Sequence, residues 1–574
     1  MNTIDIEQAI EKKFPTFFTS QPKIISKPIK SLCRKLFREH EINQFLAENE
    51  GLEGMDFVDA VLDHFNFTYS SSNADRINIP STGRVLIVAN HPLGAVDGLA
   101  LLKYVKEIRP DVKMVSTDML SQLTPLSSLM LPVDNLHGST TRQNMAAITH
   151  ELQQEHAVII FPSGEVSRIN PKGIRDSHWK SGFLHFSKQT NAPILPVFLK
   201  GKNSTLFYGV SLLNKAASGT LLVREMFKQN TKGIDITVGE TIPASQLEIP
   251  GIKKSERARL VKRHVYRIGH KREGIFNTEP AIAHPESRQQ IKLALNPAQL
   301  IGKTHDDKHI YLLEHQPDSA LQREIGRLRE YTFRQVGEGT GKRRDVDLYD
   351  RHYQHLVLWD NNDMEIVGAY RIGNGQQIMD TIGVKGFYSA SLFNYSESLH
   401  PIMQQGIELG RSFVQPKYWG SRALDYLWQG IGAYLQAHPQ VKYLFGPVSI
   451  SPTYTIEAQQ LITYFYSLYF PANEHIATAN HPFIIPNNQQ KALQTLFTGD
   501  NYKADFKILK QQMSAMGTTV PTLYKQYGDL CEKGGVFMLD FGIDPDFGGC
   551  IDGLILVDVN RFTDKKRQRY LTSR

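Results

Sequence analysis

Residues 84–98 read RVLIVANHPLGAVDG. The run from Val85 to Ala89 is apolar and short, which is typical of a buried β-strand. The proline and the glycines that follow it indicate a loop. A histidine and a carboxylate, His91 and Asp97, are therefore expected on a loop at the end of a strand. Loops held by a rigid sheet are common places for catalytic groups.

A second block of the same kind reads VIIFPSGEVSR at 158–168. It is again a short apolar run that opens into a turn with proline, glycine and polar side chains. Two shorter blocks follow, WKSG at 179–182 and APILPV at 192–197. Across residues 84–240, short apolar runs alternate with longer amphipathic stretches, and this pattern predicts an α/β fold.

In order and content these blocks resemble the glycerolipid (lysophospholipid) O-acyltransferase family. The resemblance implies that His91 takes the proton from an acceptor hydroxyl while this oxygen attacks an acyl thioester, and that Asp97 orients the imidazole. An unperturbed imidazole titrates near pH ~6.5, so it can act as a base near neutral pH. The chain has one residue more between His91 and Asp97 than the family pattern, which we expect the loop to absorb. The block at 158–168 implies the substrate-binding residues Ser163, Gly164, Glu165 and Arg168.

Two departures from the family concern the acceptor. Ser163 stands where the family has a glutamate. The block LPVDN at 131–135 lacks the arginine that, in the family, meets the phosphate of the acceptor. An acceptor without a phosphate group is therefore expected. The alternative for His91 is a purely structural role at the end of its strand.

The chain has 574 residues, which is too long for one hydrophobic core and indicates about two to four domains. A hydrophobic content of 41% and a charged content of 21% are typical of globular proteins. No apolar run approaches the ~20 residues that span a bilayer, and the N-terminus lacks a secretory signal pattern, so a cytoplasmic location is expected. The cysteines Cys33, Cys531 and Cys550 lack metal-ligand spacing. We expect neither a metal nor a bound cofactor.

The net charge of +7 is concentrated in a few segments. Residues 253–272 are rich in lysine and arginine and carry an apolar stripe at helical spacing, formed by Val261, Val265 and Ile268. The stretch 23–38 has the same character. Because basic amphipathic helices bind anionic surfaces, two partners are expected: the inner face of the bacterial cytoplasmic membrane, with the protein peripheral on it, and acyl carrier protein. A solvated helix face is the alternative, and no nucleic-acid partner is expected.

The chain is expected to contain three regions. These are a helical, membrane-associating N-terminal region (1–75), the O-acyltransferase domain (76–290) and a second α/β domain (300–574). The second domain begins with a helix from Ala320 to Arg334. The elements expected after it are a hairpin of two strands (355–359 and 366–372), a strand (407–414), a helix (423–438) and a strand (442–446).

This order resembles a GNAT-type N-acyltransferase. More narrowly it resembles the acyl-homoserine-lactone synthases and the ornithine N-acyltransferases, which take acyl groups from acyl carrier protein. The homoserine-lactone synthases carry a tryptophan shortly after the position of Phe333, where this chain has Gly337-Glu338-Gly339. The ornithine-type branch is therefore the better match.

An N-acyltransferase has to bind an ammonium group and remove its proton. The resemblance makes Glu408 the candidate base. Gly420, Ser421 and Arg422 precede a helix, so they can bind the phosphate of a phosphopantetheine arm. The resemblance also implies a network of charged residues that holds the acceptor. A surface ion-pair cluster is the alternative. The residues concerned are Arg329, Asp347, Asp350, Arg371 and Arg411.

Two further patterns are set aside. The run GEGTGK at 337–342 has no strand before it and does not match a P-loop. Near the C-terminus, Asp540, Asp544 and Asp546 lack the pattern of an EF-hand loop. The tail from Val520 is expected to hold one strand followed by a turn-rich segment.

As a whole the chain resembles the bifunctional ornithine lipid synthases. The C-terminal domain would attach a 3-hydroxyacyl group to the α-amine of ornithine, and the N-terminal domain would then esterify the 3-hydroxyl of this lyso-aminolipid. Acyl carrier protein, as its phosphopantetheine thioester, would be the co-substrate of both steps. Three alternatives remain: a single-activity lysophospholipid acyltransferase, an aminolipid synthase that uses glycine, lysine or glutamine, and a non-catalytic haemolysin-like membrane-associated protein.

Overall fold

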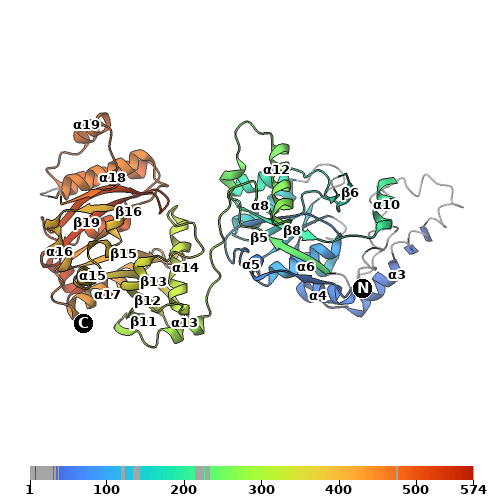
Figure 1. Ribbon diagram of the computed structural model, residues 1–574, viewed down its shortest axis with the longest axis horizontal. Coiled ribbons are helices and arrows are strands. Elements are labelled where there is room, and N and C mark those ends of the chain that lie inside the picture. Colours follow the sequence, from blue (N-terminus) through green and yellow to red (C-terminus); the bar gives the residue numbers. More distant parts are fainter. Residues whose placement is uncertain are drawn as a thin grey trace. The chain divides into compact units, whose positions relative to one another are not determined.

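The computed structural model describes most of the chain and divides it into two compact units, Met1–His284 and Pro285–Arg574 (Figure 1). Each unit is described by itself. Apart from a few isolated residues before Arg38, the described residues are 38–117, 123–133, 142–171, 173–213, 225, 233–472 and 476–572.

The first unit is built on a sheet with the strand order β1-β9-β8-β2-β5-β3-β4. Strands β8, β2, β5, β3 and β4 are mutually parallel, whereas β9 runs antiparallel to β8. The carboxyl ends of the parallel strands therefore meet at one edge. The bounds are β1 Thr68–Ser70, β2 Val85–Ala89, β3 Lys113–Thr117, β4 Met130–Val133, β5 Ala157–Ile160, β8 Ile194–Lys200 and β9 Gly233–Val238, with a separate hairpin of β6 Arg168–Asn170 and β7 Gly173–Arg175.

Helices cover both faces of this sheet. Alternate side chains of β2 enter two cores: Val85 and Ile87 pack with α4 and α6, and Leu86 and Val88 pack with α8, α9 and α12. In Figure 1, α8 and α12 lie above β5 and β8, and α4 and α6 lie below them. The bounds are α3 Glu39–Glu48, α4 Gly54–His64, α5 Asn73–Arg76, α6 Ala95–Lys106, α8 Arg142–Gln153, α9 Gly182–Thr190, α10 Thr205–Leu213 and α12 Lys254–Ile268, with short 3₁₀ turns η1 Thr124–Leu129 and η2 Ala244–Leu247.

The structure of the first unit differs from three predictions made from the sequence. Residues 1–75 are predicted as a region of their own, but α4 packs into the core of the first unit, because Phe57 and Val58 are buried against α6. Asp97 is predicted on a loop, yet it lies in the first turn of α6. The apolar stripe of α12 does not face a membrane, because Val261 and Val265 are fully buried under the sheet.

The basic surface of α12 remains exposed. The apolar positions predicted within 23–38 lie outside the described residues. Of the helices that the structure describes, none has both the length and the apolar character needed to cross a bilayer.

The second unit contains a sheet with the strand order β10-β11-β12-β13-β15-β16-β19-β18. Its pairs are antiparallel except for β15 and β16, which run parallel. The α/β prediction is thus confirmed for both units. The bounds are β10 Gln299–Lys303, β11 Lys308–Leu313, β12 Gln354–Asp360, β13 Glu365–Asn374, β15 Gly406–Val414, β16 Tyr443–Ile450, β18 Val536–Asp544 and β19 Cys550–Asp558, with a small separate sheet of β14 Phe393–Tyr395 and β17 Ala477–Ala479.

The helices of this unit again form two layers. One face of the sheet carries α17, α18, α20 and α21, and the other carries α13, α14, α15 and α16. The bounds are α13 Arg288–Ala294, α14 Ala320–Gln335, α15 Gly375–Thr381, α16 His400–Gln404, α17 Ala423–Ala437, α18 Ile456–Tyr469, α19 Asn487–Leu496, α20 Tyr502–Ala515, α21 Thr522–Gly528 and α22 Asp564–Tyr570; the 3₁₀ turns are η3 Leu348–His352, η4 Val384–Gly386, η5 Ser389–Ser391, η6 Glu397–Leu399, η7 Pro416–Tyr418 and η8 Val559–Arg561.

The tail differs from its prediction. It supplies two strands, β18 and β19, and β19 pairs with β16 along its whole length. The segment predicted as turn-rich contains β19, whose sequence CIDGLILVD includes an aspartate and a glycine that disfavour strands. Asp552 accepts a hydrogen bond from Ser449, and Gly553 leaves room for Phe541 and Tyr524, which a Cβ atom there would meet at 2.7 and 2.8 Å. Pairing with β16 and β18 overrides the low strand propensity of both residues.

Strands β15 and β16 pair only where Gly406–Glu408 lies opposite Tyr443–Phe445. Beyond this point β15 stays with β13, and β16 continues with β19 as far as Ile450. The two strands therefore part in the middle of the sheet. Arg411 lies on the open side, in the left-handed region with φ of 47°.

Candidate active sites

The structure brings His91 and Asp97 together in the first unit. The His91 Nδ1 atom lies 3.0 Å from Asp97 Oδ1, and Asp97 Oδ2 accepts a hydrogen bond from the Leu93 backbone N–H (2.8 Å). Gly94 makes this possible, because its φ of 116° turns the chain directly into α6. The extra residue between the pair is thus absorbed by a glycine turn and by the start of a helix.

The loop that carries His91 is anchored to β8 through Asn90, the residue before His91. The Asn90 side chain bonds both the N–H and the C=O of Leu199 on β8, at 2.7 and 2.9 Å. Asp97 is fully buried, and 19% of the His91 side chain is exposed. Burial lowers the pKa of His91, but the charge and hydrogen bonding of Asp97 and the charge of Asp176 outweigh it, so the pKa lies above the ordinary 6.5. The imidazole is therefore a stronger base than a free histidine.

Asp176 is a residue that the sequence did not single out. Its Oδ1 accepts from the His91 backbone N–H (3.2 Å) and from the Ser167 hydroxyl, and its Oδ2 accepts from Trp179 Nε1 (2.9 Å). Lys262 on α12 donates to the Asp176 carbonyl (2.6 Å). Asp176 thus joins the loop of His91, the block 158–168 and α12. The WKSG block, which begins three residues later, was the only nearby signal.

An apolar cavity of about 220 Å³ opens beside the imidazole. His91 and Gly164 line it, and the ring centroids of His91 and Phe161 are 4.4 Å apart. Because most of its wall is hydrocarbon, the cavity suits an alkyl chain. Other residues of the wall are Met114, Val133, Met145, Ile148 and Phe183.

The residues of the block 158–168 that are predicted to bind substrate separate into two groups. Gly164 lines the cavity, and the buried Ser163 donates to the Glu165 carbonyl (2.7 Å) and closes the turn. The Arg168 Nε atom lies 3.5 Å from Glu165 Oε2, and its Nη1 donates to Ser211 on α10. A substrate contact of Glu165 or Arg168 stays a prediction. Asp134 lies outside the described residues.

In the second unit the predicted charged residues form one buried network. Arg329 donates to Asp350 (2.8 Å), and Arg371 donates to Asp347 (2.6 Å). Arg411 Nε lies 2.9 Å from Asp345, which the sequence analysis did not identify. This arrangement holds the segment around η3 against α14, β13 and β15. A surface ion-pair cluster is excluded by the burial of all three arginines.

Glu408 lies at the last paired position of β15 and is 1% exposed. Its carboxylate accepts from the Tyr353 hydroxyl, from the Tyr388 N–H (3.0 Å) and from the Ser389 N–H (2.8 Å). These donors occupy both oxygens. Glu408 therefore holds the segment before η5 in place, and its role as the base stays a prediction.

Gly420, Ser421 and Arg422 are exposed and directly precede α17. The Ser421 hydroxyl donates to the Tyr418 carbonyl (2.6 Å) and accepts from the Ala423 N–H (3.2 Å). The next element after β15 is the 3₁₀ turn η7, and α17 follows it, so the helix is the first one after the strand that parts from β16. This position is compatible with a bound phosphopantetheine phosphate.

Two carboxylates near the parted strands were not predicted. Asp552 on β19 is 3% exposed and accepts from the Ser449 hydroxyl of β16 (2.7 Å). Glu338 follows α14 and has the charges of Asp552 and Arg411 close by. Burial raises the pKa of Asp552 to about 7. Burial and the charge of Asp552 raise the pKa of Glu338 to about 8.

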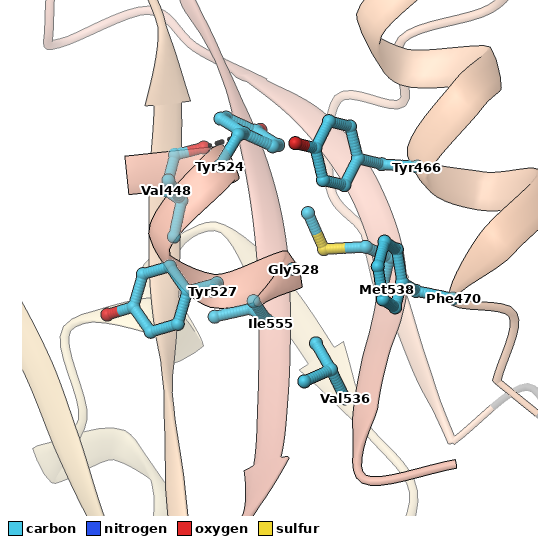
Figure 2. A pocket seen from close by; sticks show the side chains of 9 residues that line it. All are labelled: Val448, Tyr466, Phe470, Tyr524, Tyr527, Gly528, Val536, Met538 and Ile555. Atoms are coloured by element: carbon cyan, nitrogen blue, oxygen red, sulfur yellow. Dashed lines mark hydrogen bonds between the residues drawn. The ribbon is translucent and has the colours of Figure 1, made fainter. Parts of the chain in front are cut away.

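Two other features do not form sites. On the opposite face of the sheet, Tyr524 donates to the Val448 carbonyl (2.8 Å) beside an apolar gap that leaves no room for a water molecule (Figure 2). Asp540 and Asp544 bond separate partners, the Ala479 N–H and the Tyr388 hydroxyl. Among the described residues, no three His, Cys, Asp or Glu side chains are placed to hold a metal.

The sequence matches two families of known domains. Residues 15–272 match an acyltransferase family, and residues 328–429 match the acetyltransferase (GNAT) domain. A glycine N(alpha)-acyltransferase of Bacteroides thetaiotaomicron is 34% identical over 303 residues, which is 50% of this chain and 89% of that protein. A lyso-glycine lipid O-acyltransferase of the same organism is 32% identical over 248 residues, 42% of this chain and 88% of that protein. An L-ornithine N(alpha)-acyltransferase of Rhizobium meliloti is 40% identical over 112 residues, 18% of this chain and 36% of that protein.

Proposed function

The chain belongs to the acyltransferases related to the glycine N(alpha)-acyltransferases and the lyso-glycine lipid O-acyltransferases, and we propose that it builds an aminolipid in two acyl transfers. The predicted pair of acyltransferase domains is confirmed. The second unit attaches a 3-hydroxyacyl group to the α-amine of ornithine. The first unit then esterifies the 3-hydroxyl of this lyso-aminolipid. The presence in one chain of two catalytic settings, each on its own sheet, carries the proposal.

In the first unit His91 acts as the general base. Its Nδ1 side is directed to Asp97, which leaves Nε2 to take the proton of the acceptor hydroxyl. The oxygen then attacks the thioester carbon, a C–O bond forms, the C–S bond breaks, and the imidazolium returns its proton to the leaving thiolate. The buried charge of Asp97 stabilises the imidazolium. The apolar cavity beside the ring holds the transferred alkyl chain.

In the second unit the thioester arm lies where β15 and β16 part, because their unpaired backbone groups can bond its amides. The phosphate of the arm lies at the N-terminus of α17, against Gly420–Arg422. The first unit lacks the arginine that, in the O-acyltransferase family, contacts the phosphate of the acceptor. Its absence from the block 131–135 agrees with an acceptor that carries no phosphate. In this assignment each unit has its own binding site for an acyl thioester, one for N-acyl transfer and one for O-acyl transfer.

Glycine is the second candidate for the acceptor amino acid. A glycine N(alpha)-acyltransferase and a lyso-glycine lipid O-acyltransferase are matched over 89% and 88% of their own length at 34% and 32% identity, whereas an ornithine enzyme matched over a similar share, 80%, is 26% identical. Ornithine differs from glycine in carrying a second ammonium group, which a binding site can recognise.

Acyl carrier protein is the donor carrier in this proposal, and the protein works on the inner face of the cytoplasmic membrane. The exposed lysines and arginines in and around α12 support both assignments, because acyl carrier protein and the inner leaflet are anionic. The side chains concerned are Lys253, Lys254, Arg259, Arg263, Lys271 and Arg272.

Expression in a bacterial host without aminolipids tests the function. We expect a new ninhydrin-positive, phosphorus-free lipid in the extract, and feeding with labelled ornithine or glycine identifies the amino acid by which label enters it. An unchanged lipid profile would favour a non-catalytic membrane protein. Acylation of lysophospholipid alone would favour the single-activity alternative.

A further inference from the structure

Three segments distant in sequence meet beside the parted strands. The Ser451 hydroxyl after β16 donates to the Val336 carbonyl after α14. The turn between β18 and β19 presses on the same loop, since a Cβ atom at Gly548 would lie 2.6 Å from the Gly337 carbonyl oxygen. The loop that carries Glu338 is therefore fixed against β16 and the β18–β19 turn.

Asp552 and Glu338 have unused acceptor capacity at this junction. Asp552 Oδ1 accepts from Ser449 (2.7 Å) and weakly from Cys550 (3.9 Å), but none of the described residues donates to its Oδ2. The Glu338 carboxylate has no hydrogen bond or ion pair with any residue that the structure describes. A carboxylate oxygen in a largely buried place is costly to leave without a donor unless a ligand or water supplies one.

The charges around the pair leave it uncompensated. The charge of Arg411 acts on both carboxylates, but its guanidinium is already bound by Asp345 (2.9 Å) and lies over the rings of Tyr388 (4.4 Å) and Phe547 (4.6 Å). The other groups whose charge or hydrogen bonding acts on the pair on this face of the sheet are neutral or acidic: Asp544 of β18, Tyr388 before η5, Cys550 of β19 and Ser449 of β16.

We propose that Asp552 and Glu338 form the binding site for the ammonium group of the acceptor amino acid, and that Asp552 takes its proton. This assignment rests on the N-acyltransferase function proposed above. The ligand class is a primary ammonium, which supplies the donors that Asp552 Oδ2 and Glu338 lack and the positive charge that Arg411 does not provide.

The proton balance of the step is complete. The ammonium gives one proton to a carboxylate, and the free amine attacks the thioester carbon, so that a C–N bond forms and the C–S bond breaks. The nitrogen loses a second proton to the leaving thiolate. The carboxylate then returns its proton to solvent, which reaches the partly exposed Glu338 more readily than the buried Asp552.

The position fits a thioester between the strands. Two residues beyond the point where β15 and β16 part act on the pair. Ser449 on β16 donates a hydrogen bond to Asp552, and the charge of Arg411 on β15 lowers the pKa of Asp552. An amine held by the pair therefore lies beside the opening in the sheet. Glu408 lies on the closed side of this point, with all its donors inside the protein.

The test is steady-state kinetics of amide formation with the full-length chain and the variants Asp552→Asn and Glu338→Gln. Asp546→Asn is the matched control, because Asp546 is an aspartate with an exposed side chain on the turn between β18 and β19, shortly before Asp552 in the chain. We expect Asp552→Asn to lower kcat/KM for the amino acid by about 10²–10⁴-fold. Glu338→Gln should raise the KM for the amino acid about tenfold, as expected for loss of one charged hydrogen bond. The KM for the acyl thioester and the rate of ester formation should stay within about twofold.

The pH profile separates this role from a structural one. Because both carboxylates have raised pKa values, amide formation by the wild type should fall as the pH drops through about 7–8, and this limb should shift or disappear in Asp552→Asn. Full activity of both variants would overturn the inference alone. Parallel loss of amino-acid and thioester affinity, with a lower Tm, would also overturn it. A wild type that forms no amide from any amino acid would remove the proposed function, and this inference with it.

Discussion

At the scale of single residues, His91 is the group whose loss should separate the two activities. His91→Ala removes the base of ester formation and leaves the second unit untouched, so ester formation should fall about 10²–10⁴-fold while amide formation continues. The mono-acylated amino acid should then accumulate in lipid extracts. His270→Ala, at an exposed position in the same unit, is the control. Loss of amide formation in folded His91→Ala would reverse the assignment of activities to units.

The buried carboxylate of Asp552 should lower the stability of the folded second unit at neutral and higher pH. Its pKa is raised on folding from 3.8 to about 7, so the folded state binds a proton more tightly than the unfolded chain, and stability is lost as the pH rises from about 4 to 7. Asp552→Asn removes this loss. At pH 8 the variant should be more stable by about 2–4 kcal/mol, a Tm several degrees higher, with no difference near pH 4. Thermal unfolding at both pH values measures this, and a variant less stable than wild type at pH 8 would contradict the buried charge.

At the scale of elements, the glycine turn before α6 sets the distance between His91 and Asp97. Gly94 has φ of 116°, which side chains other than glycine rarely adopt, so Gly94→Ala should displace the first turn of α6 and with it Asp97. Ester formation should drop at least tenfold. Gly51→Ala is the matched control, because Gly51 also has a positive φ (92°) but lies in open space before α4. Equal ester formation by both variants would show that the turn does not set the catalytic pair.

The exposed face of α12 should govern the encounter with the acyl donor. Reversing charge at Arg259 and Arg263 leaves the buried side of the helix unchanged, so the fold should persist. The rate with acyl carrier protein should fall and lose its salt dependence, whereas the rate with acyl-coenzyme A should change little. Stopped-flow or steady-state assays at low and high salt measure both. A salt-independent rate in the wild type would remove this role.

These elements also show what a sequence can and cannot predict. The strand before His91, the helix α14 and the hairpin of β12 and β13 have local periodicity and were predicted correctly. The apolar stripe of α12 was correct as a pattern, but a pattern cannot tell whether a membrane or the protein's own sheet covers it. Asp176, Asp345, Glu338 and Asp552 were missed because their roles come from contacts between segments far apart in the chain, and no local spacing encodes them.

At the scale of the whole molecule, the two units have separate cores and separate sheets, so each should work when the other is inactive. Glu408→Ala should stop amide formation, because it leaves the Tyr388 and Ser389 N–H groups without an acceptor, yet it should still esterify a supplied N-(3-hydroxyacyl) amino acid.

Mixing two variants extends this argument to the intermediate. His91→Ala makes only the amide and Glu408→Ala makes only the ester, so their mixture forms the diacylated lipid only if the lyso-aminolipid leaves one molecule and enters another. The lyso-aminolipid has one acyl chain, and a single chain holds a molecule only weakly in a membrane, so exchange should be fast. We expect the mixture to form the product at a rate that rises with protein concentration, measured by chromatography of the extracted lipids. A mixture that accumulates the amide without esterifying it, although Glu408→Ala esterifies the supplied compound, would mean that the intermediate passes between the units of one chain without release.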